Sequence, residues 1–168
     1  MTTIRSTAFD VRAFRAGDGE ALRALWLAAG FRLLGDEDAG LATFAERNPG
    51  LFLVATTPGG TIVGSAMGAW DGRRGWIYHV ATSATHRRTG VASALVARIE
   101  ARLAELGVVR VNVLVREGNE RGRAFWTAAG YEAASRQFGK DLTGDLTDHA
   151  GGGVGADGAG AGADRPNR

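Results

Sequence analysis

Arginine, glycine and alanine gather where a predicted helix begins, and this combination suits the binding of an anion. The stretch reads Arg87-Arg88-Thr89-Gly90-Val91-Ala92. The first backbone N–H groups of a helix have no acceptor within the helix and carry about half a positive charge from the helix dipole. Gly90 and Ala92 let a ligand approach the backbone, and arginines suit phosphate oxygens. A pyrophosphate fits this loop, although the two arginines could instead be solvated surface charges.

Apolar spacing predicts the elements on either side of the loop. A strand over residues 76–82 precedes it, and a long helix over residues 90–106 follows it. Apolar side chains of that helix recur at spacings of four and three, which places one stripe toward the core. The stripe consists of Ala92, Val96, Ile99, Leu103 and Leu106. Beyond the helix we expect a strand where valines alternate at residues 109–115, a helix at 119–129 and a last strand at 131–142.

The chain before the loop predicts two helices and a run of antiparallel strands. Alternation at residues 9–14 indicates a first strand, after which Asp18 suits the N-cap of a helix that ends at Gly30. A second helix covers residues 36–47, and its acidic start, Asp36-Glu37-Asp38, either complements the helix dipole or forms an acidic rim for a cationic substrate. Strands at 51–56, 61–70 and 76–82 are separated by short turns, which is typical of a meander. The fold class is therefore α/β with a mixed sheet.

Composition sets the domain organisation and excludes several kinds of site. The chain has 168 residues and no cysteine, so disulfides, a cysteine nucleophile and a cysteine-rich metal site are excluded, and we expect no metal. The net charge of +2 is too small to indicate a nucleic-acid partner. No segment resembles a membrane span or a secretion signal, which predicts a cytoplasmic protein without a membrane partner. Residues 6–142 form the expected domain, and the Gly, Ala and Asp of residues 143–168 predict a disordered tail.

The spacing Arg-x-x-Gly-x-Ala, after a strand and at the start of a helix, resembles the pyrophosphate loop of the GCN5-related N-acetyltransferase (GNAT) family. The order of elements is also similar to the fold of that family over nearly all of the chain before the tail. A second segment adds to the resemblance, because an Asn begins a helix that ends in an aromatic pair and a Gly-aromatic. These residues are Asn119, Phe125, Trp126, Gly130 and Tyr131.

The resemblance implies acetyl-CoA as co-substrate and a direct transfer of its acetyl group to an amine. In such a fold the strand before the loop carries a bulge and splays from the next parallel strand, so the pantetheine arm lies against the backbone of Val80, Ala81 and Thr82. The N–H groups of residues 88–92 would hold the pyrophosphate. Asn119 would begin its helix beside the pantetheine arm, and Trp126 would either line the cofactor groove or pack in the core.

Two residues of the strand before the loop are the candidates for catalysis. Many family members carry a Glu there as general base, whereas this strand reads Trp76-Ile77-Tyr78-His79-Val80. Histidine titrates near neutral pH, which suits a base at His79, and Tyr78 could order a water; either residue could instead be structural. A lysine-like amine with a pKa of about 10.4 is rarely neutral at pH 7, whereas a peptide α-amine with a pKa near 8 is neutral about a tenth of the time. A site without a carboxylate base therefore favours an amine of low pKa.

The chain departs from the family pattern at the position of the general acid. Many members have a Tyr where this chain has Trp126, and an indole N–H cannot protonate the departing thiolate. A thiol with a pKa of about 8.5 leaves a thiolate that water can protonate near neutral pH, so the loss need not abolish transfer.

The same resemblance implies the binding partners of the protein, and it leaves alternative functions open. The acceptor is a small-molecule amine or a peptide N-terminus, and a homodimer is compatible with the family. A non-catalytic module that binds acyl-CoA is the alternative function, because the base is not obvious. A different nucleotide binder is disfavoured, since the chain has neither a Gly-Lys-Ser/Thr P-loop nor a Gly-x-Gly-x-x-Gly motif.

Overall fold

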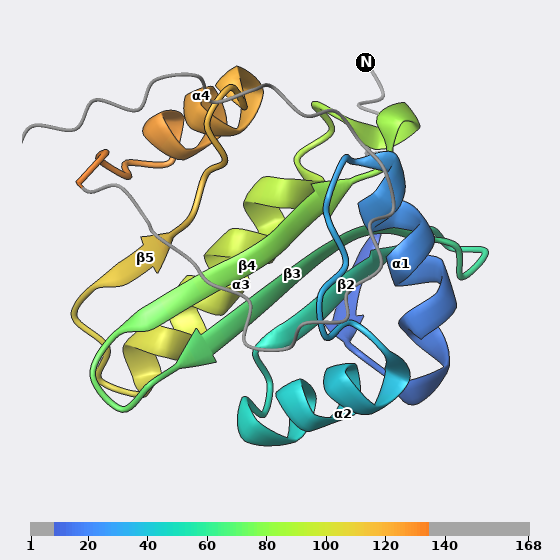
Figure 1. Ribbon diagram of the computed structural model, residues 1–168, viewed down its shortest axis with the longest axis horizontal. Helices are drawn as coiled ribbons and strands as arrows, with labels where there is room; N and C mark the ends of the chain where they lie inside the picture. The colour runs from blue at the N-terminus through green and yellow to red at the C-terminus, as the bar shows by residue number, and fades with distance from the viewer. Residues whose placement is uncertain (1–8, 135–168) are drawn as a thin grey trace, which may run out of the picture. The chain divides into compact units, whose positions relative to one another are not determined.

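Five strands form one sheet in the order β1-β2-β3-β4-β5 in the computed structural model, which describes residues 9–134 (Figure 1). The strands are β1 (Asp10–Ala13), β2 (Phe52–Thr56), β3 (Ile62–Trp70), β4 (Gly75–Thr82) and β5 (Val111–Val113). The helices are α1 (Gly19–Ala28), α2 (Asp38–Arg47), α3 (Val91–Glu105) and α4 (Glu120–Ala128), with short 3-10 helices η1 (Ala16–Asp18) and η2 (Ala84–His86). Strands β1 to β4 pair antiparallel and β5 pairs parallel to β4, which confirms the mixed α/β class.

The sheet is covered on both faces, and strand β2 shows how the two cores form. All five of its residues are buried. Leu53 and Ala55 belong to the core that α3 covers, whereas Phe52 and Val54 belong to the core that α1 and α2 cover. Successive side chains of a strand point to opposite faces, so a continuous apolar run is what a strand covered on both sides requires. None of the helices within residues 9–134 is long and apolar enough to cross a membrane.

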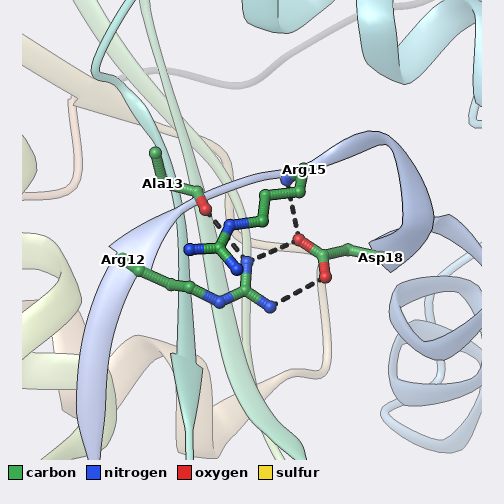
Figure 2. A network of polar contacts seen from close by, with 4 residues as sticks. All are labelled: Arg12, Ala13, Arg15 and Asp18. Atoms are coloured by element: carbon green, nitrogen blue, oxygen red, sulfur yellow. Dashed lines mark hydrogen bonds and ion pairs between the residues drawn. The ribbon is translucent and has the colours of Figure 1, made fainter. Parts of the chain in front are cut away.

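The first helix begins directly after Asp18, as predicted, but the role of the Asp18 side chain and the start of the second helix are corrected. Asp18 precedes α1, but its carboxylate does not cap that helix. Instead it accepts two hydrogen bonds from the guanidinium of Arg12, at 2.7 and 2.8 Å, and one from the backbone N–H of Arg15 at 2.7 Å (Figure 2). Helix α2 begins at Asp38, two residues later than the acidic run suggested, because Asp36 turns inward and is 7% exposed.

The elements from α3 to α4 follow the predicted order, but their lengths differ from the prediction. Of the predicted stripe of α3, Val96, Ile99 and Leu103 are buried, whereas Ala92 and Leu106 are only half-buried. Val91 and Leu95 are buried in addition. Strand β5 is shorter than the run of valines, and Val109 lies outside it with 87% of its surface exposed. Residues 131–134 have no regular structure, so the predicted last strand is wrong for them. The rest of that strand, residues 6–8 of the predicted domain and the predicted tail lie outside the described residues.

Candidate functional site

Strands β4 and β5 pair over only part of their length and leave one edge of β4 uncovered. The parallel register joins Gly75 to Val111 and ends where Ile77 meets Val113. Strand β4 continues to Thr82, while the chain after β5 leaves the sheet toward α4 (Figure 1). Within residues 9–134, no strand pairs with the β5-facing edge of residues 78–82. This edge contains Val80, Ala81 and Thr82, and its backbone groups can hydrogen-bond a ligand that lies between the strands.

A bulge sits in the same part of β4. Ser65 pairs with Ala81 and Met67 pairs with Tyr78, so one residue of β3 faces two residues of β4, His79 and Val80. His79 takes a φ of 48°, the left-handed region that a side chain seldom adopts. Such a bulge re-aims side chains. It places Tyr78 and His79 on the same face of the sheet, since Tyr78 packs into the α1/α2 core and the His79 ring contacts Trp26 of α1.

Ser65 holds the bulge from the neighbouring strand. Its hydroxyl accepts a hydrogen bond from the indole Nε1 of Trp26 at 2.8 Å and donates one to the backbone carbonyl of His79 at 3.0 Å. Ser65 and Trp26 are both fully buried. A buried polar group is costly to leave unpaired, so these two bonds favour the strained backbone of His79 over a regular strand.

The loop between β4 and α3 contains backbone N–H groups that have no acceptor within residues 9–134. The first turn of α3 is closed by the bond from Ala94 N to Gly90 O at 2.9 Å, and the N–H groups of residues 87–93 donate to no other described residue. Gly90 takes a φ of 88° and Arg88 a φ of 62°, while the Thr89 hydroxyl bonds the carbonyl of His86 at 2.6 Å. Successive N–H groups at a helix N-terminus form an anion site, and Arg87 and Arg88 beside them are exposed.

Glycine brings this helix terminus against the sheet. A Cβ on Gly64 of β3 would collide with the Val91 side chain at the start of α3, and it would lie 3.2 Å from the carbonyl oxygen of Ala81. The missing side chain therefore lets the start of α3 lie close to the open part of β4. The anion site and the uncovered strand edge are consequently neighbours, as a ligand with a phosphate group and an extended arm requires.

A pocket of about 210 Å³ opens on the face where the bulge places Tyr78 and His79. Its remaining lining comes from the segment around α2 and from β3: Leu34, Gly35, Asp36, Gly40, Leu41, Phe44 and Met67. The walls are mostly apolar, and the side chains of Asp36, Tyr78 and His79 can exchange or donate protons. Burial raises the pKa of Tyr78, so its hydroxyl stays neutral at physiological pH.

Asp36 lines this pocket as a buried, ionised carboxylate. Burial opposes its ionisation, but contact with His79 and the hydrogen bond from Leu34 N at 2.9 Å outweigh burial and hold the pKa of Asp36 below its ordinary value. Its Oδ2 lies 3.6 Å from Nε2 of His79. Sequence analysis indicated His79 as a candidate base but interpreted Asp36 as part of a helix start or of an acidic rim. The closeness of Asp36 to His79 is therefore a finding of the tertiary structure.

Comparison with known proteins decides the family. Residues 18–131 match the acetyltransferase (GNAT) family. An acetyltransferase of Pectobacterium atrosepticum is 35% identical over 124 residues, which cover 73% of this chain and 87% of that protein. The chain belongs to the GNAT acetyltransferase family. As a GNAT member it is an acyltransferase that uses an acyl-CoA.

Solved structures agree with the fold of this GNAT protein. The Ard1 structure from Thermoplasma volcanium superposes with a TM-score of 0.70 at 23% identity, over 76% of this chain and 85% of that one. The PaiA N-acetyltransferase of Thermoplasma acidophilum, solved in complex with coenzyme A, gives a TM-score of 0.68 at 15% identity, over 77% and 93% of the two chains. At these identities the likeness concerns the fold, and the fold expected from the sequence is confirmed.

Asn119 and Trp126 of this GNAT chain both have structural partners. The Asn119 side chain caps α4 by accepting a hydrogen bond from Gly122 N at 2.9 Å. Trp126 is 9% exposed and makes edge contacts with Phe125 at 5.0 Å and Tyr131 at 4.8 Å. For Trp126 the core placement is one of the two that the sequence analysis left open. A contact of either residue with the cofactor stays a prediction.

Two residues of the site carried a sequence signal that was missed. Ser65 is a polar residue in a strand that is otherwise apolar and glycine-rich, and a buried hydroxyl needs partners. Trp26 was counted only as part of an apolar helix face, although its indole N–H also needs an acceptor. Asp36 had no such signal, because its neighbours Glu37 and Asp38 are also acidic.

Proposed function

We propose that this GNAT protein transfers an acetyl group from acetyl-CoA directly to a primary amine, either a small molecule or a peptide α-amine. The observation that carries the proposal is the run of N–H groups at residues 87–93 beside the edge of β4; both lack backbone partners within the described part of the chain. One surface suits a pyrophosphate and the other suits an extended amide-containing arm. Acetyl-CoA has both parts in a single molecule.

The cofactor contacts divide between the loop and the strand. The N–H groups of Arg88, Thr89, Gly90, Val91 and Ala92 would bind the pyrophosphate, with Arg87 and Arg88 supplying charge. The edge at Val80, Ala81 and Thr82 would hold the pantetheine arm through backbone hydrogen bonds. Asn119 stays a candidate for the same arm, whereas we assign Trp126 to the packing of α4.

The reaction needs three events that the site can support. The amine nitrogen attacks the thioester carbonyl carbon, and backbone N–H groups near Val80 and Ala81 would stabilise the charge that develops on the carbonyl oxygen. The C–S bond then breaks and the thiolate leaves, to take a proton from water near neutral pH. The amine loses its proton to His79, with Tyr78 as a neutral donor that orders the acceptor or a water. Without any cysteine in the chain, no acyl-cysteine intermediate forms.

The pocket supports a preference among amines. Most of its lining is apolar, so an acceptor that carries an apolar group next to its amine would bury that group there. An α-amine is also easier to deprotonate than a lysine side chain, since its pKa is about 8 rather than about 10.4. We therefore expect α-amines and small amines of low pKa to react faster than lysine-type amines.

Calorimetry with acetyl-CoA tests the cofactor site. The double variant Arg88→Glu with Gly90→Glu places two carboxylates in the loop. We expect the native protein to bind acetyl-CoA and the double variant to lose that binding. A matched control is Arg73→Glu with Gly72→Glu in the turn between β3 and β4. Gly72 has a φ of 89°, close to the 88° of Gly90, and a Cβ added at either glycine would meet no atom within 4 Å beyond its chain neighbours. The control should bind as the native protein does.

Transfer is then measured by the release of free thiol from acetyl-CoA with panels of α-amines, small amines and lysine derivatives. Native protein that binds no acetyl-CoA at millimolar concentration would refute the proposal. Tight binding without turnover on any amine would instead favour a binding module over an enzyme.

A further inference from the structure

We infer that Asp36 is a positioning residue that holds the imidazole of His79 so that Nδ1, and not Nε2, receives the proton of the acceptor amine. The inference rests on the proposed function, because it concerns the base of the same site. Four features carry it: the burial of Nε2, the packing of the ring, the approach of Asp36 and the bulge that fixes the backbone.

The two nitrogens of His79 lie in different surroundings. Nε2 is buried, and it has no hydrogen-bond partner among the described residues. The side chain as a whole is 22% exposed, so its accessible surface belongs to other atoms of the residue. A base that exchanges a proton with a bound amine has to be reachable from the pocket. That requirement excludes Nε2 and leaves Nδ1.

Aromatic side chains restrict the orientation of the ring. Phe31 stacks on His79 with 5.1 Å between ring centroids and 18° between planes, and Trp26 contacts it edge-on at 4.5 Å. The backbone is held as well, since the carbonyl of His79 accepts the hydrogen bond of Ser65 within the bulge. A flipped ring would place a different nitrogen against the same walls, so the packing alone does not choose the tautomer.

The carboxylate of Asp36 makes that choice. Its Oδ2 lies 3.6 Å from Nε2, longer than a good hydrogen bond but close enough for a charge to act across a buried contact. A negative oxygen at this place favours a proton on Nε2, which leaves the lone pair on Nδ1. It also stabilises the imidazolium that forms when the amine gives up its proton. Asp36 therefore acts through His79 and touches neither the acetyl group nor the amine in this scheme.

Titratable and charged groups of β4 and α1 stand beside the pair. Tyr78 lies beside His79 in the pocket. Arg23 of α1 faces Asp36 from the other side, where its guanidinium donates to the Asp36 carbonyl at 3.3 Å and pairs with Asp38 at 2.7 Å. Arg23 favours the ionised form of Asp36. The local charge thus favours an anionic Asp36.

The position of Asp36 has a purely structural explanation that the test must separate. Its Oδ2 also accepts the N–H of Leu34 at 2.9 Å, so it could serve only to shape the turn before α2. Asp36→Asn keeps an oxygen for that N–H and removes the charge. Asp38→Asn is the matched control, because Asp38 stands on the same segment, loses the same charge and is 73% exposed.

The first measurement is the ¹⁵N spectrum of the His79 ring in the full chain at pH about 7.5, without any substrate. Native protein should carry its proton on Nε2. Asp36→Asn should show a mixture of tautomers, because a neutral amide can face Nε2 with its oxygen or with its NH₂ group. A native spectrum with the proton on Nδ1 would overturn the inference, and this readout needs no variant to fold.

The second measurement separates kcat from KM in the thiol-release assay. Asp36→Asn should lower kcat by at least about 10-fold while the KM for acetyl-CoA stays within about 2-fold, and the acidic limb of its pH–rate profile should shift. Asp38→Asn should match the native protein in the spectrum and in the rates. Unchanged kcat in Asp36→Asn would remove the role of Asp36 and leave the proposed function standing. If Asp36→Asn loses the tautomer preference while the native protein acetylates no amine, the result would support the pairing of Asp36 with His79 and refute the proposed function.

Discussion

The Ser65 hydroxyl joins strand β3 to the bulge of β4 by donating to the backbone carbonyl of His79 at 3.0 Å. The same oxygen accepts the indole N–H of Trp26, so one atom connects α1, β3 and β4. The bulge turns His79 into the pocket beside Tyr78, and its partner Ser65 is fully buried. The backbone conformation of His79, the candidate base, therefore depends on Ser65, which is too deeply buried for an acceptor amine to contact.

Replacing Ser65 should show how much the bulge depends on this bond. Ser65→Ala leaves a buried indole N–H and a backbone carbonyl without their shared partner, so we expect a loss of about 2–4 kcal/mol in the free energy of unfolding. Urea denaturation measures it. Thr43→Ala is the control, because its exposed hydroxyl bonds only the Ala39 carbonyl, and its cost should stay near 0.5 kcal/mol or less, roughly the range of a surface change. Equal costs for the two variants would contradict this account of the bulge.

Gly64 should be intolerant of a methyl group. In Gly64→Ala the new Cβ meets the Val91 side chain and lies 3.3 Å from Leu95 Cδ1, so α3 must move away from the sheet. We expect a loss of about 1–3 kcal/mol from overpacking, together with weaker acetyl-CoA binding, since the N–H groups of the loop move with the helix. Gly59→Ala is the control, as its Cβ would meet only the Thr57 hydroxyl at 3.8 Å. A Gly64→Ala variant that binds and unfolds like the control would show that the close approach is unnecessary.

The Arg12–Asp18 pair should make stability depend on pH. Burial opposes the charge of Asp18, but the bonds from Arg12 and Arg15 hold the pKa of Asp18 below its ordinary value (Figure 2). A carboxyl with a lowered folded-state pKa stabilises the fold above its unfolded pKa of about 3.9, and that stability is lost as the pH falls through the folded value.

Asp18→Asn should accordingly cost about 1–3 kcal/mol at pH 7, and its difference from the native protein should shrink toward pH 2. Chemical denaturation across this pH range measures both quantities. Asp38→Asn, in an exposed pair, should cost about 1 kcal/mol or less. A difference for Asp18→Asn that is constant with pH would rule out ionisation as its origin.

Trp126 should contribute more to the stability of the fold than to the binding of acetyl-CoA. With 9% of its surface exposed, the ring has little area left for a ligand, so Trp126→Phe should lower the free energy of unfolding by about 1–2 kcal/mol through lost packing. The dissociation constant for acetyl-CoA should change by less than about 3-fold. Calorimetry and urea denaturation on one sample provide the two values, and a drop in affinity above 10-fold would place the ring in the cofactor groove, as the family resemblance allowed.

Local chemistry was enough to predict the anion loop and the order of the elements. An unpaired helix N-terminus, a glycine and flanking arginines are all contained in residues 87–92, so their meaning depends on neighbours in the chain. The meander of β2 to β4 is likewise set by short turns and apolar runs. Local sequence patterns did not predict contacts with other elements. Asp18, for example, has the pattern of a helix cap, yet its carboxylate binds Arg12 of the preceding strand.

The sequence by itself thus determined the GNAT resemblance, the prediction of a pyrophosphate loop and the choice of His79 and Tyr78 as candidates. Only the tertiary structure decided where the bulge falls, where β5 leaves β4 and which carboxylate stands behind His79. Each of these depends on the packing of segments that are far apart in the chain, as when Ser65 and Trp26 fix the backbone of His79. Periodicity specifies which face of an element is buried, but it carries no information about which side chain of another element will meet it there.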